Sequence, residues 1–186
     1  MSEPRPPHPD IARILVPEEE LQRRIRELAQ EISRDYAGRT PMLIGVLKGC
    51  VLFLSDLMKS LELDCCVDFI CLASYSGTSS SGVVRMLLDL RESAQGRDVI
   101  VIEDIVDTGL TIAYLLQNLK TRGPRSVEVC TLLDKPDCRK VAISPKYAGF
   151  RIPNEFVVGF GLDYVERYRN LPYIGVLKPS AIRKDN

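Results

Sequence analysis

Three acidic residues stand beside a turn in the stretch VIVIEDIVDTGLT, residues 99–111. Glu103 and Asp104 end a run of apolar residues, and Asp107 follows three positions later. The residues after Asp107 are small and suit a tight turn, and a helical pattern begins beyond them. The first backbone N–H groups of a helix have no partner within the helix, and the helix dipole is positive there, so such a turn favours a phosphate. The stretch therefore sets carboxylates beside a place for an anion.

Thr108 and Thr111 add hydroxyl donors to this turn, and Gly109 lets the backbone approach a ligand closely. The turn is not a Walker loop, because GxxxxGK[ST] is absent. A simpler interpretation is that Asp107 only caps the helix and that the other two acids form a solvated strand end. However, two acids that end a buried strand are costly unless they bind a cation or hydroxyls. A sugar phosphate would use both features, since carboxylates can hold ribose hydroxyls while the turn holds a 5′-phosphate.

Histidine, cysteine and net charge exclude several other kinds of chemistry. His8 is the only histidine, so we expect neither a histidine general base nor a His-rich metal site, and acid–base work falls to carboxylates, Lys or Tyr. The six cysteines form no CxxC pair and the N-terminus lacks a signal-peptide core, which predicts reduced thiols and a cytoplasmic protein. Lys plus Arg equals Asp plus Glu at 25 each, and no apolar run approaches the roughly 18 residues of a membrane span. We therefore expect neither a nucleic-acid partner nor a membrane partner.

These residues must be positioned by a fold of alternating strands and helices. The 186 residues suit one domain, which we expect over 11–186 after a flexible Pro-rich tail over 1–10. Apolar patterns predict strands at 14–16, 41–47, 65–74, 83–90, 98–103, 126–133, within 146–161 and at 173–177, and helices from 17 to a stop at Gly38, over 50–61 and over 110–119. This order predicts an α/β fold with a largely parallel sheet, and ligands bind such sheets beyond the carboxyl ends of the strands. A polar Gly/Ser stretch, 75–82, is the one long loop and is expected to be functional.

The stretch 99–111 resembles the phosphoribosyl pyrophosphate motif of type I phosphoribosyltransferases: apolar residues, two acids, two apolar residues, then D-[TS]-G-x-T. Further stretches narrow the resemblance to bacterial hypoxanthine/guanine phosphoribosyltransferases, over nearly everything after residue 12: LKGC (47–50), SY (74–75), LLDK (132–135), FVVGFGLDY (156–164) and YRNLPYIGVLKP (168–179). The resemblance implies a mainly parallel central sheet flanked by helices, with a small hood subdomain that binds the purine. It also implies transfer of a 5-phosphoribosyl group to hypoxanthine or guanine, with Mg²⁺ as cofactor and IMP or GMP and pyrophosphate as products.

The resemblance assigns roles around the ribose and the 5′-phosphate. Glu103 and Asp104 match acids associated with the ribose hydroxyls and the metal, and Asp107 matches a base near purine N7. The 5′-phosphate loop matches Thr108, Gly109, Leu110 and Thr111, with Leu110 standing where some relatives carry Lys. Because this loop acts mainly through backbone amides, the expectation is unchanged by that difference.

For the pyrophosphate and the purine, the resemblance assigns residues from three other segments. Lys48 and Gly49 match the pyrophosphate loop, in which the family holds a cis peptide before the Lys, and Arg169 matches a pyrophosphate contact. Lys135 matches the donor to the purine 6-oxo group, Phe156 the ring stacked on the base, Val157 a backbone contact and Asp163 a metal-site acid next to the purine. Ser74 and Tyr75 head the loop that closes over the site. Taken singly, Lys48 and Lys135 could be surface lysines and Phe156 a core ring.

Two alternatives stay open at this point. The chain could be a related transferase that takes xanthine or a pyrimidine, although the residues matched at the purine site disfavour pyrimidines. It could instead be a regulatory protein that keeps the fold and binds nucleic acid, but the sequence has no basic extension. By resemblance alone, we expect a homodimer or a homotetramer.

Overall fold

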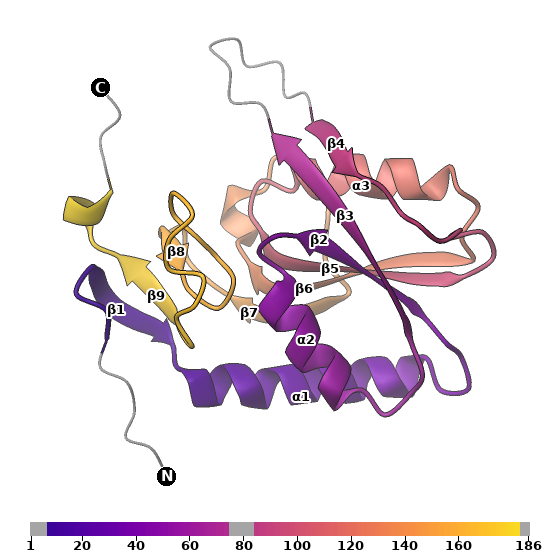
Figure 1. Ribbon diagram of the computed structural model, residues 1–186, viewed down its shortest axis with the longest axis horizontal. Helices are drawn as coiled ribbons and strands as arrows, with labels where there is room; N and C mark the ends of the chain where they lie inside the picture. The colour runs from indigo at the N-terminus through magenta and orange to yellow at the C-terminus, as the bar shows by residue number, and fades with distance from the viewer. Residues whose placement is uncertain (1–6, 75–83, 183–186) are drawn as a thin grey trace.

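A six-stranded sheet forms the main body of the protein. The computed structural model describes residues 7–74 and 84–182. The strand order is β4-β3-β2-β5-β6-β7, and every neighbouring pair is parallel except β3 and β4 (Figure 1). The strands are β2 (Met42–Leu47), β3 (Cys66–Ser74), β4 (Val84–Leu88), β5 (Asp98–Val106), β6 (Ser126–Asp134) and β7 (Tyr147–Arg151). The predicted α/β fold with a mainly parallel central sheet is confirmed.

Strand β5 is longer than the sequence pattern predicts. We expected it to end at Glu103, but it continues to Val106 because its pairing with β6 runs on to the register pair Val106 and Asp134. Its pairing with β2 stops earlier, at the pair Gly45 and Ile102. Glu103 and Asp104 therefore lie within the strand rather than after it, in the part that projects beyond β2.

Helices cover both faces of this sheet. Helix α1 (Glu18–Asp35) and helix α2 (Val51–Ser60) pack into one apolar cluster, and helix α3 (Leu110–Lys120) packs into a second cluster on the other face. The apolar residues of α1 recur at helical spacing, and each of these side chains is fully buried: Leu21, Ile25, Leu28 and Ile32. Among the described residues, no helix is both long and apolar enough to span a bilayer.

A second, three-stranded sheet stands beside the main one, at the left of Figure 1. Its order is β1 (Ile11–Val16), β9 (Ile174–Leu177), β8 (Val157–Val158), all antiparallel, so the two ends of the chain meet in it. Strand β1 begins three residues earlier than the pattern at 14–16 predicts. The single stretch expected within 146–161 is divided between β7 and β8, because the chain leaves the main sheet around Pro153, which has no N–H to donate.

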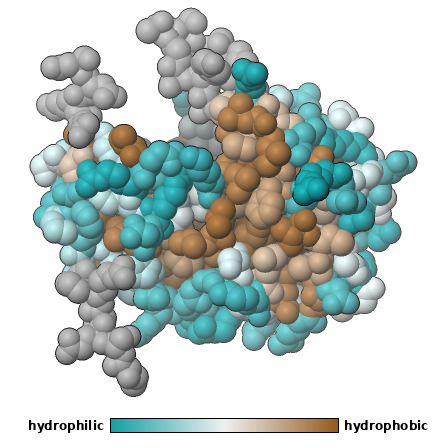
Figure 2. All heavy atoms as spheres, in the orientation of Figure 1, coloured by the Kyte–Doolittle hydropathy of each residue, from teal (hydrophilic) through white to brown (hydrophobic). Residues whose placement is uncertain are grey.

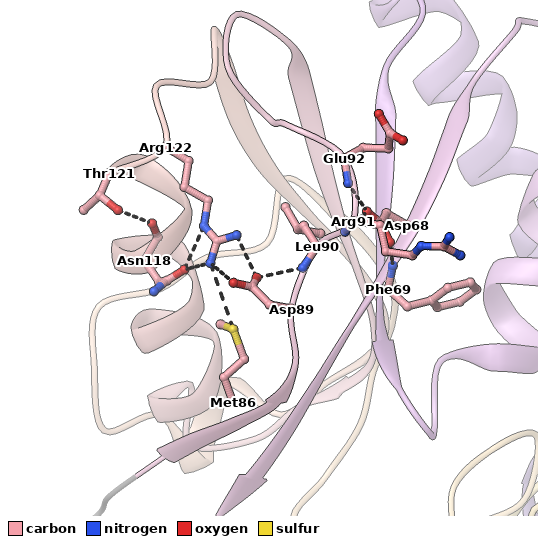
Figure 3. A network of polar contacts seen from close by, with 10 residues as sticks. All are labelled: Asp68, Phe69, Met86, Asp89, Leu90, Arg91, Glu92, Asn118, Thr121 and Arg122. Carbon is pink, nitrogen blue, oxygen red and sulfur yellow. Dashed lines mark hydrogen bonds and ion pairs between the residues drawn. The ribbon is translucent and has the colours of Figure 1, made fainter.

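A polar network fixes the chain between β4 and β5 (Figure 3). Asp68 is 6% exposed and accepts the backbone N–H groups of Phe69, Arg91 and Glu92 at 2.8, 2.7 and 3.0 Å. Burial opposes ionisation of this carboxyl, but the three hydrogen bonds outweigh it and hold the pKa of Asp68 below its ordinary value. The same segment is tied to α3, because Arg122 forms an ion pair with Asp89 at 2.7 Å.

Candidate active site

Three adjoining cavities lie where the carboxyl ends of β2, β5 and β6 approach the small sheet. A cavity of about 90 Å³ is lined by the turn after β5, one of about 260 Å³ by residues of β8 and its flanks, and one of about 230 Å³ by the turn after β2. Acids from β5 and the turn after it connect the cavities in pairs: Glu103 lines the first and third, Asp104 the second and third, and Asp107 the first and second. The three acids predicted from the sequence thus stand at a common junction.

Of the two acids inside β5, Glu103 is buried and Asp104 is half-buried, and Asp104 accepts the backbone N–H of Ile105 at 2.8 Å. Glu103 is 9% exposed, and its Oε2 atom has no hydrogen-bond partner. Burial, with the neighbouring carboxylate of Asp104 as a second cause, raises the pKa of Glu103 well above its ordinary value. Burial likewise raises the pKa of Asp104 to about 6. A cation or hydroxyl donors placed at these oxygens would relieve both penalties.

The turn after β5 forms an open cradle of backbone donors. Gly109 is the N-cap residue of α3 with φ of 80°, a left-handed conformation that glycine adopts without strain. The N–H of Leu110 lies 3.4 Å from Oγ1 of Thr108 rather than on Asp107, so the simpler interpretation of Asp107 as a helix cap is wrong. Thr108 and Thr111 line the small cavity, whereas the side chain of Leu110 is 44% exposed. The N–H groups of the first turn, which have no partner within the helix, are therefore available to an anion.

Arg139 braces this turn from behind, and the sequence pattern gave no reason to single it out. Its guanidinium donates to the backbone oxygen of Val106 at 2.9 Å and to that of Asp107, and it forms an ion pair with the buried carboxylate of Asp134. The neighbouring Lys140 donates its backbone N–H to the oxygen of Thr108 at 2.9 Å. These contacts fix the backbone at the end of β5, directly where Asp107 follows the strand.

The turn after β2 packs directly against the acids. The Leu47–Lys48 peptide bond is cis, as the resemblance implies. A Cβ atom on Gly49 would lie 1.7 Å from Oδ2 of Asp104, so only glycine fits between this carboxylate and the backbone. A Cβ on Gly161 would in turn lie 2.0 Å from the backbone oxygen of Gly49. This close packing brings the turn after β2 and the loop after β8 together beside Asp104.

Two cations border the third cavity, and both are held by acids. Arg169 forms an ion pair with Asp163 at 2.8 Å, and Lys48 forms one with Glu166 at 3.0 Å. Glu166 also lies 3.3 Å from Arg169. Hydrogen bonds from Lys48, and secondarily from Arg169, hold the pKa of Glu166 below its ordinary value. Glu166 was not among the residues expected from the sequence.

The second cavity is lined by the ammonium-bearing side chain of Lys135 and by the aromatic ring of Phe156. Lys135 is 6% exposed, so it is not a surface lysine, and its Nζ donates to the backbone oxygen of Glu155 at 2.8 Å. The same Nζ lies 3.7 Å from Oδ2 of Asp107. Phe156 precedes β8 and is 46% exposed, so it is not a core ring; it meets Tyr164 edge to face with centroids 5.4 Å apart. The cavity thus offers a flat apolar face and an N–H donor to one planar ligand.

Most of the expected site residues are therefore brought together. Val157 is buried in β8 and lines the second cavity with Asp163, which also borders the third. Ser74 is the last residue of β3, and Tyr75 and the loop expected at 75–82 lie outside the described residues. In the described part of the chain, no group of three or more His, Cys, Asp or Glu side chains is arranged to hold a metal ion by itself.

Residues 15–165 match the family model described as phosphoribosyl transferase domain. The chain is 49% identical over 175 residues to the hypoxanthine-guanine phosphoribosyltransferase of Lactococcus lactis, covering 94% of this chain and 95% of that protein. It is 54% identical over 173 residues to the bifunctional protein TilS/HprT of Listeria innocua, covering 92% of this chain. It spans only 27% of that longer protein.

Solved structures are similar over nearly the whole chain. A hypoxanthine phosphoribosyltransferase of Staphylococcus aureus superposes with a TM-score of 0.90 at 45% identity, covering 94% of this chain and 95% of that one. The hypoxanthine phosphoribosyltransferase of Trypanosoma cruzi in complex with the product IMP gives a TM-score of 0.90 at 44% identity, covering 96% of this chain and 100% of that one.

Proposed function

The chain belongs to the phosphoribosyl transferase domain family, and from that premise we propose that it transfers the 5-phosphoribosyl group from phosphoribosyl pyrophosphate to hypoxanthine and guanine. The products are IMP or GMP and pyrophosphate, and the reaction serves purine salvage. The similarity to the hypoxanthine-guanine phosphoribosyltransferase of Lactococcus lactis, and to the Trypanosoma cruzi enzyme in complex with IMP, supports this substrate class.

The observation that carries the proposal is the meeting of three cavities at three acids. A phosphoribosyl donor has a 5′-phosphate, a ribose and a pyrophosphate, and the acceptor is a planar base. The cavity beside the turn after β5 suits the 5′-phosphate, the cavity bordered by Lys48 and Arg169 suits the pyrophosphate, and the cavity between Lys135 and Phe156 suits the base. The ribose, which keeps its 5′-phosphate while C1′ exchanges its bond to pyrophosphate for a bond to the base, then lies at the junction.

Glu103 and Asp104 would hold the ribose hydroxyls and a Mg²⁺ ion. Their burial, and the unpartnered Oε2 of Glu103, fit a hard cation. Mg²⁺ usually binds one or two carboxylates together with substrate phosphates, which fits two acids that form no complete cage with other protein groups. Asp163, on the pyrophosphate side, is a further candidate contact. When bound, the ion would supply positive charge to the departing pyrophosphate.

The base is recognised by a donor and a ring. The ammonium group of Lys135 can only donate hydrogen bonds, so it favours a 6-oxo group and disfavours the 6-amino group of adenine. Phe156 offers its exposed face for stacking, and the backbone of Val157 is available to the edge of the base. Asp107, 3.7 Å from Lys135, would take a proton at purine N7 as the bond to ribose forms. The residues of the small sheet thus act as the hood over the base.

A pyrophosphate-release assay with a panel of bases tests the proposal. The full chain would be incubated with Mg²⁺, phosphoribosyl pyrophosphate and one base at a time. We expect turnover of hypoxanthine and guanine. Turnover of orotate or uracil without turnover of either purine would contradict the substrate class and favour a pyrimidine enzyme; xanthine is included because a preference for it is the nearest alternative.

Lys48 and Arg169 provide a second test, directed at the pyrophosphate cavity. Lys48→Ala and Arg169→Ala each remove one cation, so we expect the product-inhibition constant of pyrophosphate to rise roughly tenfold, as for the loss of one charge-assisted contact. Arg26→Ala, a cation on the exposed side of α1, serves as the control. An unaltered inhibition constant in both variants would remove these residues from the pyrophosphate site.

We further propose a cytoplasmic homo-oligomer. The six cysteines, all within the described residues, are free thiols, which suits a reducing compartment. Figure 2 shows an apolar band over α2 and the β3–β4 end of the sheet. The exposed apolar side chains of α2, β3 and β4 are Val51, Leu52, Val67, Leu87 and Leu88. A second copy of the chain, related by a two-fold axis, would cover this face with the same apolar face.

A further inference from the structure

A short turn in the small-sheet region has an unusual backbone for its sequence. Tyr164 and Arg167 exchange two backbone hydrogen bonds, N–H to O, of 3.2 and 3.1 Å, and so close a two-residue hairpin. The two residues between them, Val165 and Glu166, have φ of 51° and 57°. Hairpins with positive φ at both central residues favour Asn-Gly, and a β-branched residue such as Val is a marked outlier there. The fold therefore sustains a strained turn at this point, and such strain concentrates at functional sites.

The strained turn aims one carboxylate at both cations of the pyrophosphate cavity. Oε1 of Glu166 lies 3.0 Å from Nζ of Lys48, and Oε2 lies 3.3 Å from Nη2 of Arg169. The turn is fixed in place by Asp163, whose Oδ2 accepts the backbone N–H of Glu166 at 2.9 Å. Lys48 comes from the loop after β2, so the contact joins two segments that are far apart in the chain.

The link between Glu166 and Lys48 is easily opened. The two side chains are 66% and 62% exposed, and exposed ion pairs are weak because water and salt screen them. A pyrophosphate anion carries several negative charges and would compete for both cations at once. The carboxylate of Glu166 would then have to leave, and it would remain close enough to repel the bound anion.

We propose that Glu166 is an internal competitor of pyrophosphate: its carboxylate occupies Lys48 and Arg169 in the empty site, weakens pyrophosphate binding and promotes release of the product. This inference rests on the proposed function, because it assigns pyrophosphate to that cavity. Glu166 acts through the two cations and is a positioning residue, not a catalytic one. The strained turn would thus hold the negative charge of Glu166 at the same two cations that bind pyrophosphate.

Calorimetric titration of the full chain with inorganic pyrophosphate in the presence of MgCl₂ tests the proposal. Glu166→Gln keeps the shape of the side chain and removes its charge, so we expect pyrophosphate to bind about three- to tenfold more tightly than in the wild type. The gain should shrink at high salt. Glu166→Asp keeps the charge and should stay within about twofold of the wild type.

A matched control is Glu62→Gln, which removes one exposed charge at the loop after α2, at the opposite edge of the sheet. It should leave pyrophosphate affinity unchanged. Affinity in Glu166→Gln equal to or weaker than that of the wild type would overturn the inference while leaving the proposed function intact. Failure of the wild type itself to bind pyrophosphate would instead contradict the proposed function, and the inference with it.

Discussion

At the scale of single residues, the two acids within β5 are costly to ionise in the protein alone. Glu103 and Asp104 are adjacent in the chain, and burial disfavours the charged form of each. A fold optimised only for stability would place apolar residues there, as at the four strand positions just before Glu103, residues 99–102, which are buried. The acids are accounted for by a ligand that brings hydroxyls and a cation to them.

The raised pKa of Asp104 predicts how substrate binding depends on pH. With a pKa of about 6, this carboxyl is ionised above pH 6 and becomes neutral below it. Only the carboxylate attracts a cation, so the affinity for phosphoribosyl pyrophosphate with Mg²⁺ should fall below pH 6, by up to about tenfold per pH unit. Because the pKa of Asp104 is higher in the folded protein than its ordinary value, this carboxyl lowers the stability of the ligand-free protein as pH rises through 6. Affinities measured by calorimetry from pH 5 to 8 that do not change would contradict this assignment.

Asp107 makes a separate prediction about the rate. Asp107→Asn preserves the size of the side chain but cannot accept a proton at neutral pH, so we expect kcat to fall about 100-fold while phosphoribosyl pyrophosphate still binds. Steady-state kinetics and calorimetry on the same preparation measure both quantities. Asp137→Asn, an exposed acid two residues after Lys135, is the matched control and should retain the wild-type kcat. An unchanged kcat in Asp107→Asn would remove Asp107 from the role of base.

At the scale of elements, apolar periodicity predicted most strands and helices because one face or both faces of each are buried. The pattern ended β5 too early, since Glu103 and Asp104 interrupt the apolar run while the pairing with β6 continues. The phosphate-binding turn at the start of α3 could be predicted from the sequence of residues 107–111. A glycine and small hydroxyl residues directly after a buried strand are typical of such a turn.

Two contributors to the site could not have been found from local patterns. Arg139 contacts the end of β5 because the segment after β6 folds back onto it. No local feature of the sequence around Arg139 reveals this contact. Glu166 lies in a turn without the Asn or Gly that usually marks positive φ, so the sequence does not show that its side chain is directed at Lys48 and Arg169. Both depend on long-range packing.

The network around Asp68 predicts where the main sheet is most sensitive. Asp68→Ala leaves three backbone N–H groups without their acceptor (Figure 3), so we expect the free energy of unfolding to fall by roughly 2 kcal/mol. Because hydrogen bonding lowers the pKa of Asp68, its contribution is present above the ordinary pKa and is lost as pH falls through the lower, folded value. Urea unfolding at pH 7 measures the change. Asp64→Ala, an exposed acid before β3, should have little effect, and equal stabilities of the two variants would refute the role of Asp68.

At the scale of the whole molecule, the site exists only where two sheets meet. The main sheet supplies the acids, the phosphate turn and Lys48, while the small sheet and its loops supply Phe156, Asp163 and Arg169. Because β1 and β9 tie the two ends of the chain together, the purine side of the site depends on pairing between the most distant segments of the sequence. Gly49 and Gly161 let the two parts approach closely enough to share one ligand.

The exposed apolar band predicts the state of assembly. Leu87 is 59% exposed on β4 and Val51 is 45% exposed on α2, and burial of such side chains is the main favourable term in association. The double variant Val51→Asp/Leu87→Asp should sediment as a monomer, while Leu110→Asp, exposed elsewhere on α3, should leave the oligomer intact. Light scattering after size exclusion gives the masses. A wild-type chain that is itself monomeric at all concentrations would rule out this interface.

One competition experiment tests the central claim most directly. The full chain, Mg²⁺ and a limiting amount of phosphoribosyl pyrophosphate would be mixed with hypoxanthine, guanine, xanthine, adenine, uracil and orotate at equal concentrations, and the nucleotides formed would be identified by mass spectrometry. The junction of acids with Lys135 and Phe156 predicts IMP and GMP as the main products, with one pyrophosphate released per nucleotide. AMP, UMP or orotidine monophosphate as the main product, or no nucleotide at all, would contradict the function assigned to this site.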